Sequence, residues 1–195
     1  YYVNDGNPTG DIWCSAVGQP WDPFIMRGTN PAMPLNSLQA LLANYPVGAG
    51  DRVWIDTGVY SVSNTSRIIL DDGNMGSASA PLRIFGSTNV MAGGTLIQGN
   101  GTSDGIQIRN TRHLELNNLR ISQVLDAMDI GNGDTIRMKN LELFGSSNGV
   151  VASASSGVEI QNSLIFQNSA YGYSSSGDQG GQAMVNCTLW GNRMG

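Results

Sequence analysis

The clearest alternation of apolar and polar residues lies in "HLELNNLRISQ", residues 113–123. Leu114, Leu116, Leu119 and Ile121 alternate with polar residues, a pattern typical of strands that are buried on one face. Asn117 and Asn118 interrupt the alternation, which then resumes at once. The pattern predicts two short strands joined at a corner.

The same interruption recurs along the chain, in "LNNLRI", "MKNLEL", "IQNSLI" and "MVNCTL", where the repeated asparagine is Asn118, Asn140, Asn162 and Asn186. The spacings between these asparagines are 22, 22 and 24. Apolar residues flank each one at matching positions, namely Leu116, Met138, Ile160 and Met184 before it and Ile121, Leu143, Ile165 and Leu189 after it. A fixed spacing indicates a repeat architecture, in which these apolar residues form a stacked core.

A third short strand precedes each unit, in "GIQI" (105–108), "AMDI" (127–130), "GVVA" (149–152) and "YGYS" (171–174). The joints between strands lack the turn residues of two-residue hairpins, so the strands are not expected to pair within their own repeat. They can pair with the equivalent strand one repeat later. The sequence therefore predicts an all-β fold, a coiled parallel solenoid with three short strands in every coil and successive coils about 4.8 Å apart.

The repeated asparagine suits the corner of such a coil. Asn adopts the left-handed backbone conformation more readily than most residues, and its amide can bond the amides above and below it. We therefore expect Asn118, Asn140, Asn162 and Asn186 to form a structural ladder. A leucine-rich repeat has a similar period, but it requires apolar residues where Asn110, His113 and Glu115 stand.

The first quarter of the chain differs from these repeats. "PLNSLQALLANY" predicts an amphipathic helix over residues 35–45, with Asn36 as N-cap and Gln39 three residues later. Residues 1–50 are therefore expected to form an N-terminal cap and residues 51–195 the coils. The final segment "NCTLWGNRMG" contains no covering helix. We expect the coils to continue in a longer solenoid, or to stack on another copy of the chain.

With these residues in view, the sequence resembles the right-handed parallel β-helix proteins of the pectate-lyase-like superfamily. The segments that carry the resemblance are "YYVNDGN", "SLQALLANYPVGAGDRVWIDTGVY", "PLRIFGS" and "GGTLIQGN", which are similar to the cap and first coils of bacterial secreted or surface β-helix-repeat proteins. The resemblance implies the fold. It does not imply one activity, because the superfamily includes polysaccharide lyases, uronate epimerases, phage tailspikes and surface modules without catalysis.

The charge of the chain limits the classes of molecule that it is expected to bind. The net charge is −5, and the arginines are scattered along the chain, which argues against a nucleic-acid surface. No apolar run reaches the roughly 18 residues that a membrane span needs. The chain begins without methionine, and we expect removal of a leader and a secreted, extracellular or cell-surface location.

Charged residues also occupy repeat positions. Glu115, Arg137 and Glu159 follow one another at intervals of one repeat, as do Arg120 and Glu142. Opposite charges would then alternate up the stack, each pair contributing about 0.2–1 kcal/mol. This pattern indicates a structural use of charge.

Few residues are candidates for chemistry. Gln107, Arg109 and Asp129 are expected to face outward on the first strand of neighbouring coils, where they could contact a glycan. Asp104 and Asp126 occupy equivalent corners, and calcium is the candidate ion for two such close carboxylates. Otherwise we expect no cofactor, no metal site and no catalytic residue.

The sequence therefore favours a structural or adhesive β-helix module, whose partners are other coils, copies of itself or a polysaccharide. The alternatives are a polysaccharide-active enzyme, either a uronate polysaccharide lyase or an epimerase, and a glycan-binding module like those of tailspikes. Cys14 and Cys187 lie at opposite ends of the expected stack, so they are not expected to form a disulfide.

Overall fold

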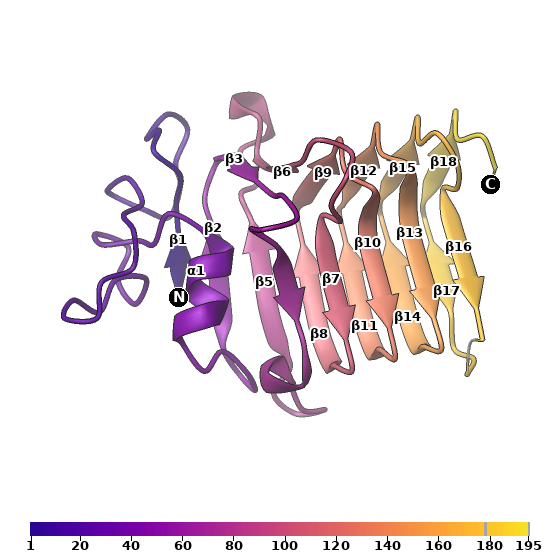
Figure 1. Ribbon diagram of the computed structural model, residues 1–195, viewed down its shortest axis with the longest axis horizontal. Helices are drawn as coiled ribbons and strands as arrows, with labels where there is room; N and C mark the ends of the chain where they lie inside the picture. Colours follow the sequence, from indigo (N-terminus) through magenta and orange to yellow (C-terminus); the bar gives the residue numbers. More distant parts are fainter. Residues whose placement is uncertain (178, 195) are drawn as a thin grey trace.

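Each repeat contributes one strand to each of three parallel sheets, and the chain winds through the sheets as a right-handed β-helix (Figure 1). The computed structural model describes residues 1–177 and 179–194. Within a coil the chain passes from β7 to β8 to β9, and β10 then pairs with β7. The expected fold class, a parallel β-helix with three short strands per coil, is confirmed.

The three sheets have the following strands in the described part of the chain. One sheet contains β1 (Tyr2–Val3), β2 (Arg52–Ile55), β5 (Leu82–Gly86), β8 (Arg112–Asn117), β11 (Asp134–Lys139), β14 (Ser156–Gln161) and β17 (Ala183–Val185). A second contains β4 (Ile68–Leu70), β7 (Ile106–Arg109), β10 (Asp126–Gly131), β13 (Asn148–Ser153) and β16 (Tyr173–Ser176). The third contains β3 (Gly58–Ser61), β6 (Thr95–Gln98), β9 (Leu119–Ser122), β12 (Glu142–Phe144), β15 (Leu164–Phe166) and β18 (Thr188–Trp190).

Pairing between successive coils stacks equivalent residues in columns. Leu116 pairs with Met138, and Met138 pairs with Ile160. All three side chains are fully buried. The same column continues to Met184, which is 39% exposed because β17 is the outermost strand of its sheet. The expectation that Met184 is a core residue was therefore wrong.

Left-handed residues recur at the corners, one coil after another. The repeated asparagines have φ values of 56° at Asn118, 55° at Asn140, 49° at Asn162 and 52° at Asn186. Three further corners show the same recurrence, at residues 110, 132, 154 and 177, at 113, 135, 157 and 181, and at 123, 145, 167 and 191. His113, with φ of 52°, belongs to one of these columns, so its position has a conformational explanation.

Two hydrogen bonds between side-chain amides connect neighbours in the asparagine column. Asn140 Nδ2 donates to Asn118 Oδ1 at 3.0 Å, and Asn186 Nδ2 donates to Asn162 Oδ1 at 2.8 Å. These side chains are near the surface, so each bond is worth about 1 kcal/mol at most. The corner conformation is the other contribution that Asn makes here.

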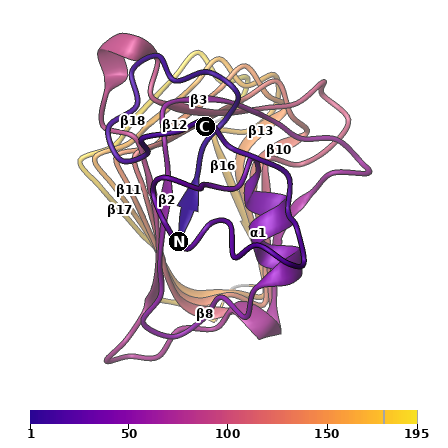
Figure 2. The same ribbon diagram turned by 90° about the vertical axis from the view of Figure 1, so that its left-hand side faces the viewer.

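The N-terminal end of the stack is covered by helix α1 (Leu38–Asn44) and by the loops that precede it (Figures 1 and 2). Leu38 and Leu41 are buried in the core. The N-cap is Ser37, whose hydroxyl accepts from the Ala40 N–H, and not Asn36 as the sequence suggested. Gln39 does not close a capping box, because its amide donates to the backbone oxygens of residues 61 and 66.

A single buried carboxylate fixes the N-terminal loop to the first coil. Asp56 follows β2 and is fully buried. Its Oδ1 accepts the N–H groups of Ile12 and Thr57, both at 2.8 Å. Its Oδ2 accepts those of Trp13 at 2.8 Å and Cys14 at 2.6 Å. Four backbone donors satisfy this charge, which explains how it is buried without a cation beside it.

Short single-turn 3₁₀ helices occur at Asp72–Asn74 (η1) and Val90–Ala92 (η2). Cys14 and Cys187 are free thiols, in the cap and next to β18 respectively. No helix in residues 1–177 and 179–194 combines the length and the hydropathy needed to cross a lipid bilayer.

We predict that Asn140→Ala lowers the melting temperature by about 3–6 °C. The variant loses the side-chain hydrogen bond to Asn118 and places Ala in the left-handed backbone region. Asn140→Gly is the matched control, since Gly restores the corner conformation without the amide. The expected order of thermal stability is wild type, then Asn140→Gly, then Asn140→Ala. A melting temperature of Asn140→Ala equal to that of the wild type would contradict the prediction.

We also predict that Asp56→Asn destabilises the fold by about 3 kcal/mol or more, because an amide NH₂ would face two backbone N–H donors. Denaturant unfolding measures the change. Asp51→Asn is the control, because its carboxylate accepts only the Gly48 N–H from the described residues, and it should cost about 1 kcal/mol or less. Equal losses in the two variants would show that the buried carboxylate does not fix the loop.

Candidate functional site

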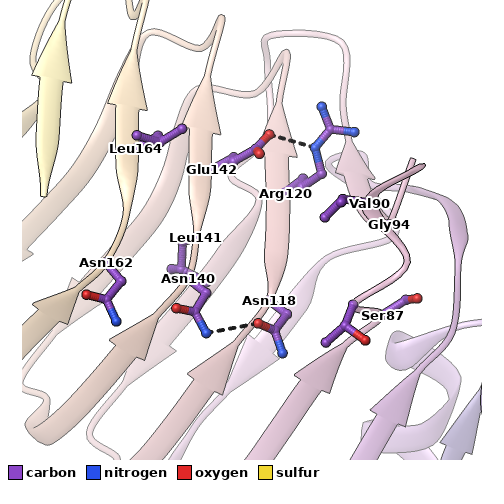
Figure 3. A pocket seen from close by; sticks show the side chains of 11 residues that line it. Ser87, Val90, Gly94, Asn118, Arg120, Asn140, Leu141, Glu142, Asn162 and Leu164 are labelled. Atoms are coloured by element: carbon purple, nitrogen blue, oxygen red, sulfur yellow. Dashed lines mark hydrogen bonds and ion pairs between the residues drawn. The ribbon is translucent and has the colours of Figure 1, made fainter. Parts of the chain in front are cut away.

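A groove of about 260 Å³ runs along one corner of the stack (Figure 3). One side is formed by the loop between β5 and β6. The asparagine column and the start of the third sheet form the rest. The lining residues are Ser87, Thr88, Val90, Gly94, Asn118, Arg120, Asn140, Leu141, Glu142, Asn162 and Leu164.

The charged residues of the groove are paired. Arg120 Nε donates to Glu142 Oε2 at 2.8 Å (Figure 3). Arg120 Nη1 donates to the Gly93 carbonyl at 2.8 Å. The guanidinium also lies 5.5 Å from the centre of the Phe144 ring. These contacts hold Arg120 and neutralise Glu142. The groove can therefore hydrogen-bond a neutral ligand through amides and hydroxyls, but it offers no acid and base pair for proton transfer.

A second cluster lies on the sheet that contains β7 and β10. One carboxylate oxygen from each of Asp104, Asp126 and Asp129 lies within 4.8 Å of the others. Asp104 and Asp126 were expected to stand close at equivalent corners, and the structure adds Asp129 from the same coil as Asp126.

Neighbouring side chains satisfy this cluster. Gln107 Nε2 donates to Asp104 Oδ2 at 2.6 Å, and Asn148 Nδ2 donates to Asp126 Oδ1 at 2.7 Å. Arg109 donates to the Asp129 side chain and, at 2.9 Å, to the Asp129 carbonyl. The expected glycan-facing residues Gln107, Arg109 and Asp129 therefore lie together, and they bind within this cluster.

Burial raises the pKa of Asp126 above its usual value. The hydrogen bond from Asn148 opposes the shift, whereas the charges of Asp104 and Asp129 add to it. Burial and the two neighbouring carboxylates thus disfavour the ionised form of Asp126, whereas Asn148 and Arg109 favour it.

Sequence reasoning missed the loop side of the groove, Ser87, Thr88, Val90 and Gly94. These residues lie where the repeat is irregular, and no counterpart one repeat away marks them. The asparagine side was marked by its spacing, although as a structural column and not as the lining of a groove.

Comparison with known proteins agrees with the fold. Residues 87–195, more than half of the chain, match the model of a family described as NosD, periplasmic copper-binding protein. No curated protein matches the chain.

Two solved structures are similar over the whole length. Pectate lyase Pel9A has a TM-score of 0.71 and 14% identity, over 98% of this chain and 48% of that chain. A rhamnogalacturonan lyase has a TM-score of 0.61 and 15% identity, over 100% of this chain and 53% of that chain. This chain spans about half the length of each, and the similarity is one of fold. The resemblance to pectate-lyase-like β-helices is confirmed at that level.

We predict that Asp126→Asn stabilises the protein at neutral pH. A carboxyl whose pKa is raised by folding contributes stability below its unfolded pKa and loses that contribution as the pH rises through the folded pKa. Asn keeps the acceptor for Asn148 and removes the repulsion. Melting temperatures in EDTA should be about 1–3 °C higher than wild type at pH 7 and equal below the unfolded pKa. The exposed Asp134→Asn is the control, and a loss of stability at pH 7 in Asp126→Asn would contradict the argument.

Proposed function

This chain belongs to the family described as NosD, periplasmic copper-binding protein, and on that premise we propose that it is a structural or adhesive β-helix module of an exported protein. The family description supports export. The proposal is that the module works outside the cytoplasm, in the periplasm, in the extracellular space or on the cell surface.

The observation that carries the proposal is the pairing of charges up the stack. Arg83 bonds Glu115 at 2.8 Å, and Arg137 lies 3.9 Å from Glu115 and 3.3 Å from Glu159. Glu115, Arg137 and Glu159 thus each meet an opposite charge on a neighbouring coil. Arg52 instead pairs with Arg83, a like charge, at the N-terminal end of the column. Each exposed pair contributes little energy, about 0.2–1 kcal/mol, but together the pairs neutralise the charges that they contain.

Paired arginines are poor catalytic bases. Lyases of this superfamily use a basic side chain to remove a proton next to a carboxylate of the polysaccharide, and calcium or arginine neutralises that carboxylate. In the described residues, the basic group beside the acidic cluster is Arg109, and its guanidinium is held by Asp129 and by backbone oxygens. This arrangement favours a structural role for Arg109 over an enzymatic one.

Adhesion, in this proposal, uses the groove along the asparagine column. Its amides and hydroxyls offer hydrogen bonds to a polysaccharide, and Val90, Leu141 and Leu164 offer apolar contact. The stacked rings of Phe144, Phe166 and Trp190, with centroids 5.2 and 5.3 Å apart, stiffen the same sheet.

Length is the other property that the module supplies. In this proposal residues 1–50 cap the stack, and the coils of residues 51–195 pair through the outer edges of β16, β17 and β18 with further coils or with another copy. The matched structures, which are about twice as long, are consistent with this arrangement.

The His, Cys, Asp and Glu side chains of the described residues form no site of the kind that copper prefers. Copper prefers imidazole and sulfur ligands. In the described residues, the single histidine, His113, belongs to no group of three or more His, Cys, Asp and Glu ligands, and the one such group is made of carboxylates. Burial, the charge of Asp56 and a hydrogen bond with it raise the pKa of the Cys14 thiol to about 12, so without a metal ion this thiol is protonated at neutral pH. We therefore carry no copper chemistry over.

We predict that the protein releases no unsaturated uronate from pectate, rhamnogalacturonan or alginate, with or without calcium, under conditions where a known pectate lyase does. Affinity electrophoresis in gels containing the same polysaccharides tests adhesion separately. Release of product by the wild type but not by Arg109→Ala would overturn the structural proposal. Retardation in the gel without product would support the adhesive form of it.

A further inference from the structure

The N-terminal cap contains a buried polar cluster that is separate from both the groove and the Asp104 cluster. Asn4 and Asp11 belong to the segment that Asp56 fixes to the first coil. Asn4 is fully buried, and Asp5 and Asp11 are half-buried. This part of the molecule therefore contains three carboxylates: those of Asp5 and Asp11 in the N-terminal segment, and that of Asp56, which follows β2.

Two of these carboxylates are satisfied by backbone donors. Asp56 accepts four N–H groups, as described above. Asp5 Oδ1 accepts the Asn7 N–H at 2.7 Å, and Asp5 Oδ2 accepts the Val59 N–H at 3.1 Å. Asp5 and Asp56 thus have hydrogen bonds at both oxygens.

Asn4 and Asp11 each have one side-chain oxygen without a hydrogen bond. Asn4 Nδ2 donates to Asp11 Oδ2 at 2.7 Å and to the Ala16 carbonyl at 2.9 Å. Asn4 Oδ1 and Asp11 Oδ1 are buried, and neither has a hydrogen-bond partner. An unpaired buried acceptor costs about 1–3 kcal/mol, so two in one place need an explanation.

The side chains of Asn4 and Asp11 are in direct contact. Asn4 Oδ1 belongs to the amide whose nitrogen lies 2.7 Å from Asp11 Oδ2, and an amide oxygen and nitrogen are about 2.2 Å apart. The oxygen of Asn4 is therefore within about 5 Å of the carboxylate of Asp11. One bound group can reach both side chains.

The surroundings favour a cation. The ion pairs of the described residues involve Arg83, Arg109, Arg120 and Arg137, and none reaches Asp5, Asp11 or Asp56. The site is thus short of positive charge as well as of hydrogen-bond donors.

We propose that Asn4 Oδ1 and Asp11 Oδ1 bind a calcium ion that fastens the N-terminal segment to the first coil. Amide and carboxylate oxygens are the ligands that calcium takes, and it tolerates the irregular geometry of a loop. Asp5 supplies a further negative charge nearby. The ion would stabilise the cap and therefore the exposed end of the stack that the cap covers.

The Asp104 cluster provides the matched comparison. It also contains three carboxylates, but Gln107, Asn148 and Arg109 already satisfy them. Internal partners compete with an ion there, whereas Asn4 and Asp11 have no internal partner at the oxygens in question. The proposal thus assigns calcium to the cap and not to β7 and β10.

The test compares the intact protein in EDTA and in excess calcium. Calcium at one hundred times its dissociation constant should raise the melting temperature by about 5–10 °C. Asp126→Asn should keep this shift, and Asp11→Asn should lose it. Terbium is the second probe, because Trp13, two residues from Asp11, can sensitise its luminescence; calcium should compete for it, and Asp11→Asn should abolish it.

Circular dichroism checks that Asp11→Asn is folded. If it is not, Asp5→Asn serves in its place, with an expected several-fold loss of calcium affinity. Equal melting temperatures in EDTA and calcium would mean that a buried water or a protonated Asp11 satisfies the two oxygens, and the proposal would be wrong. A calcium shift that Asp126→Asn removes and Asp11→Asn keeps would assign the ion to the other cluster and would also overturn it.

Discussion

Parallel hydrogen bonding between coils is the interaction on which the rest of this structure depends. Each strand pairs with its equivalent in the next coil, as in Met138 with Leu116 on one side and Ile160 on the other. Every side chain therefore has its own counterparts as nearest neighbours above and below. A residue type is favourable at a position only if it stacks well in that column, and this requirement explains the repeat in the sequence.

The corners of the coils also depend on stacking between equivalent residues, and they use it in two different ways. On the outside, asparagines take the left-handed conformation and bond in pairs, Asn118 with Asn140 and Asn162 with Asn186. On the inside, Asn168 is buried and accepts the Ser146 N–H at 3.1 Å, while Asn192 Oδ1 accepts the Asn168 N–H at 3.1 Å. The side chain of one coil thus supplies the acceptor that the turning backbone of the previous coil lacks.

Charge is treated differently in the coils and in the cap. In the sheet that contains β8, stacking places Arg83 beside Glu115 and Arg137 beside Glu159, so these partially exposed charges are neutralised at little cost. The cap has no stacking to supply a partner. There Asp56 is satisfied by backbone N–H groups, and Asn4 and Asp11 each retain an unpaired oxygen. The cap is therefore the place where an external ion would contribute most.

The sequence by itself determined the coils, because a stacked column repeats its residue type at a fixed spacing. The three strands, the asparagine corners and the alternating charges of residues 115, 137 and 159 could all be predicted from the period of 22. The inner column of Ser146, Asn168 and Asn192 has the same spacing, with steps of 22 and 24, and could have been found in the same way.

Only the tertiary structure decided the features that join different parts of the chain. Asp56 meets the N–H groups of residues 12–14, more than forty positions earlier, and the loop of residues 87–94 closes one side of the groove. Neither contact repeats, so no spacing in the sequence marks it. The N-cap of α1 was misplaced by one residue for a related reason, because Asn36 and Ser37 are both good caps and the backbone path into the helix selects Ser37.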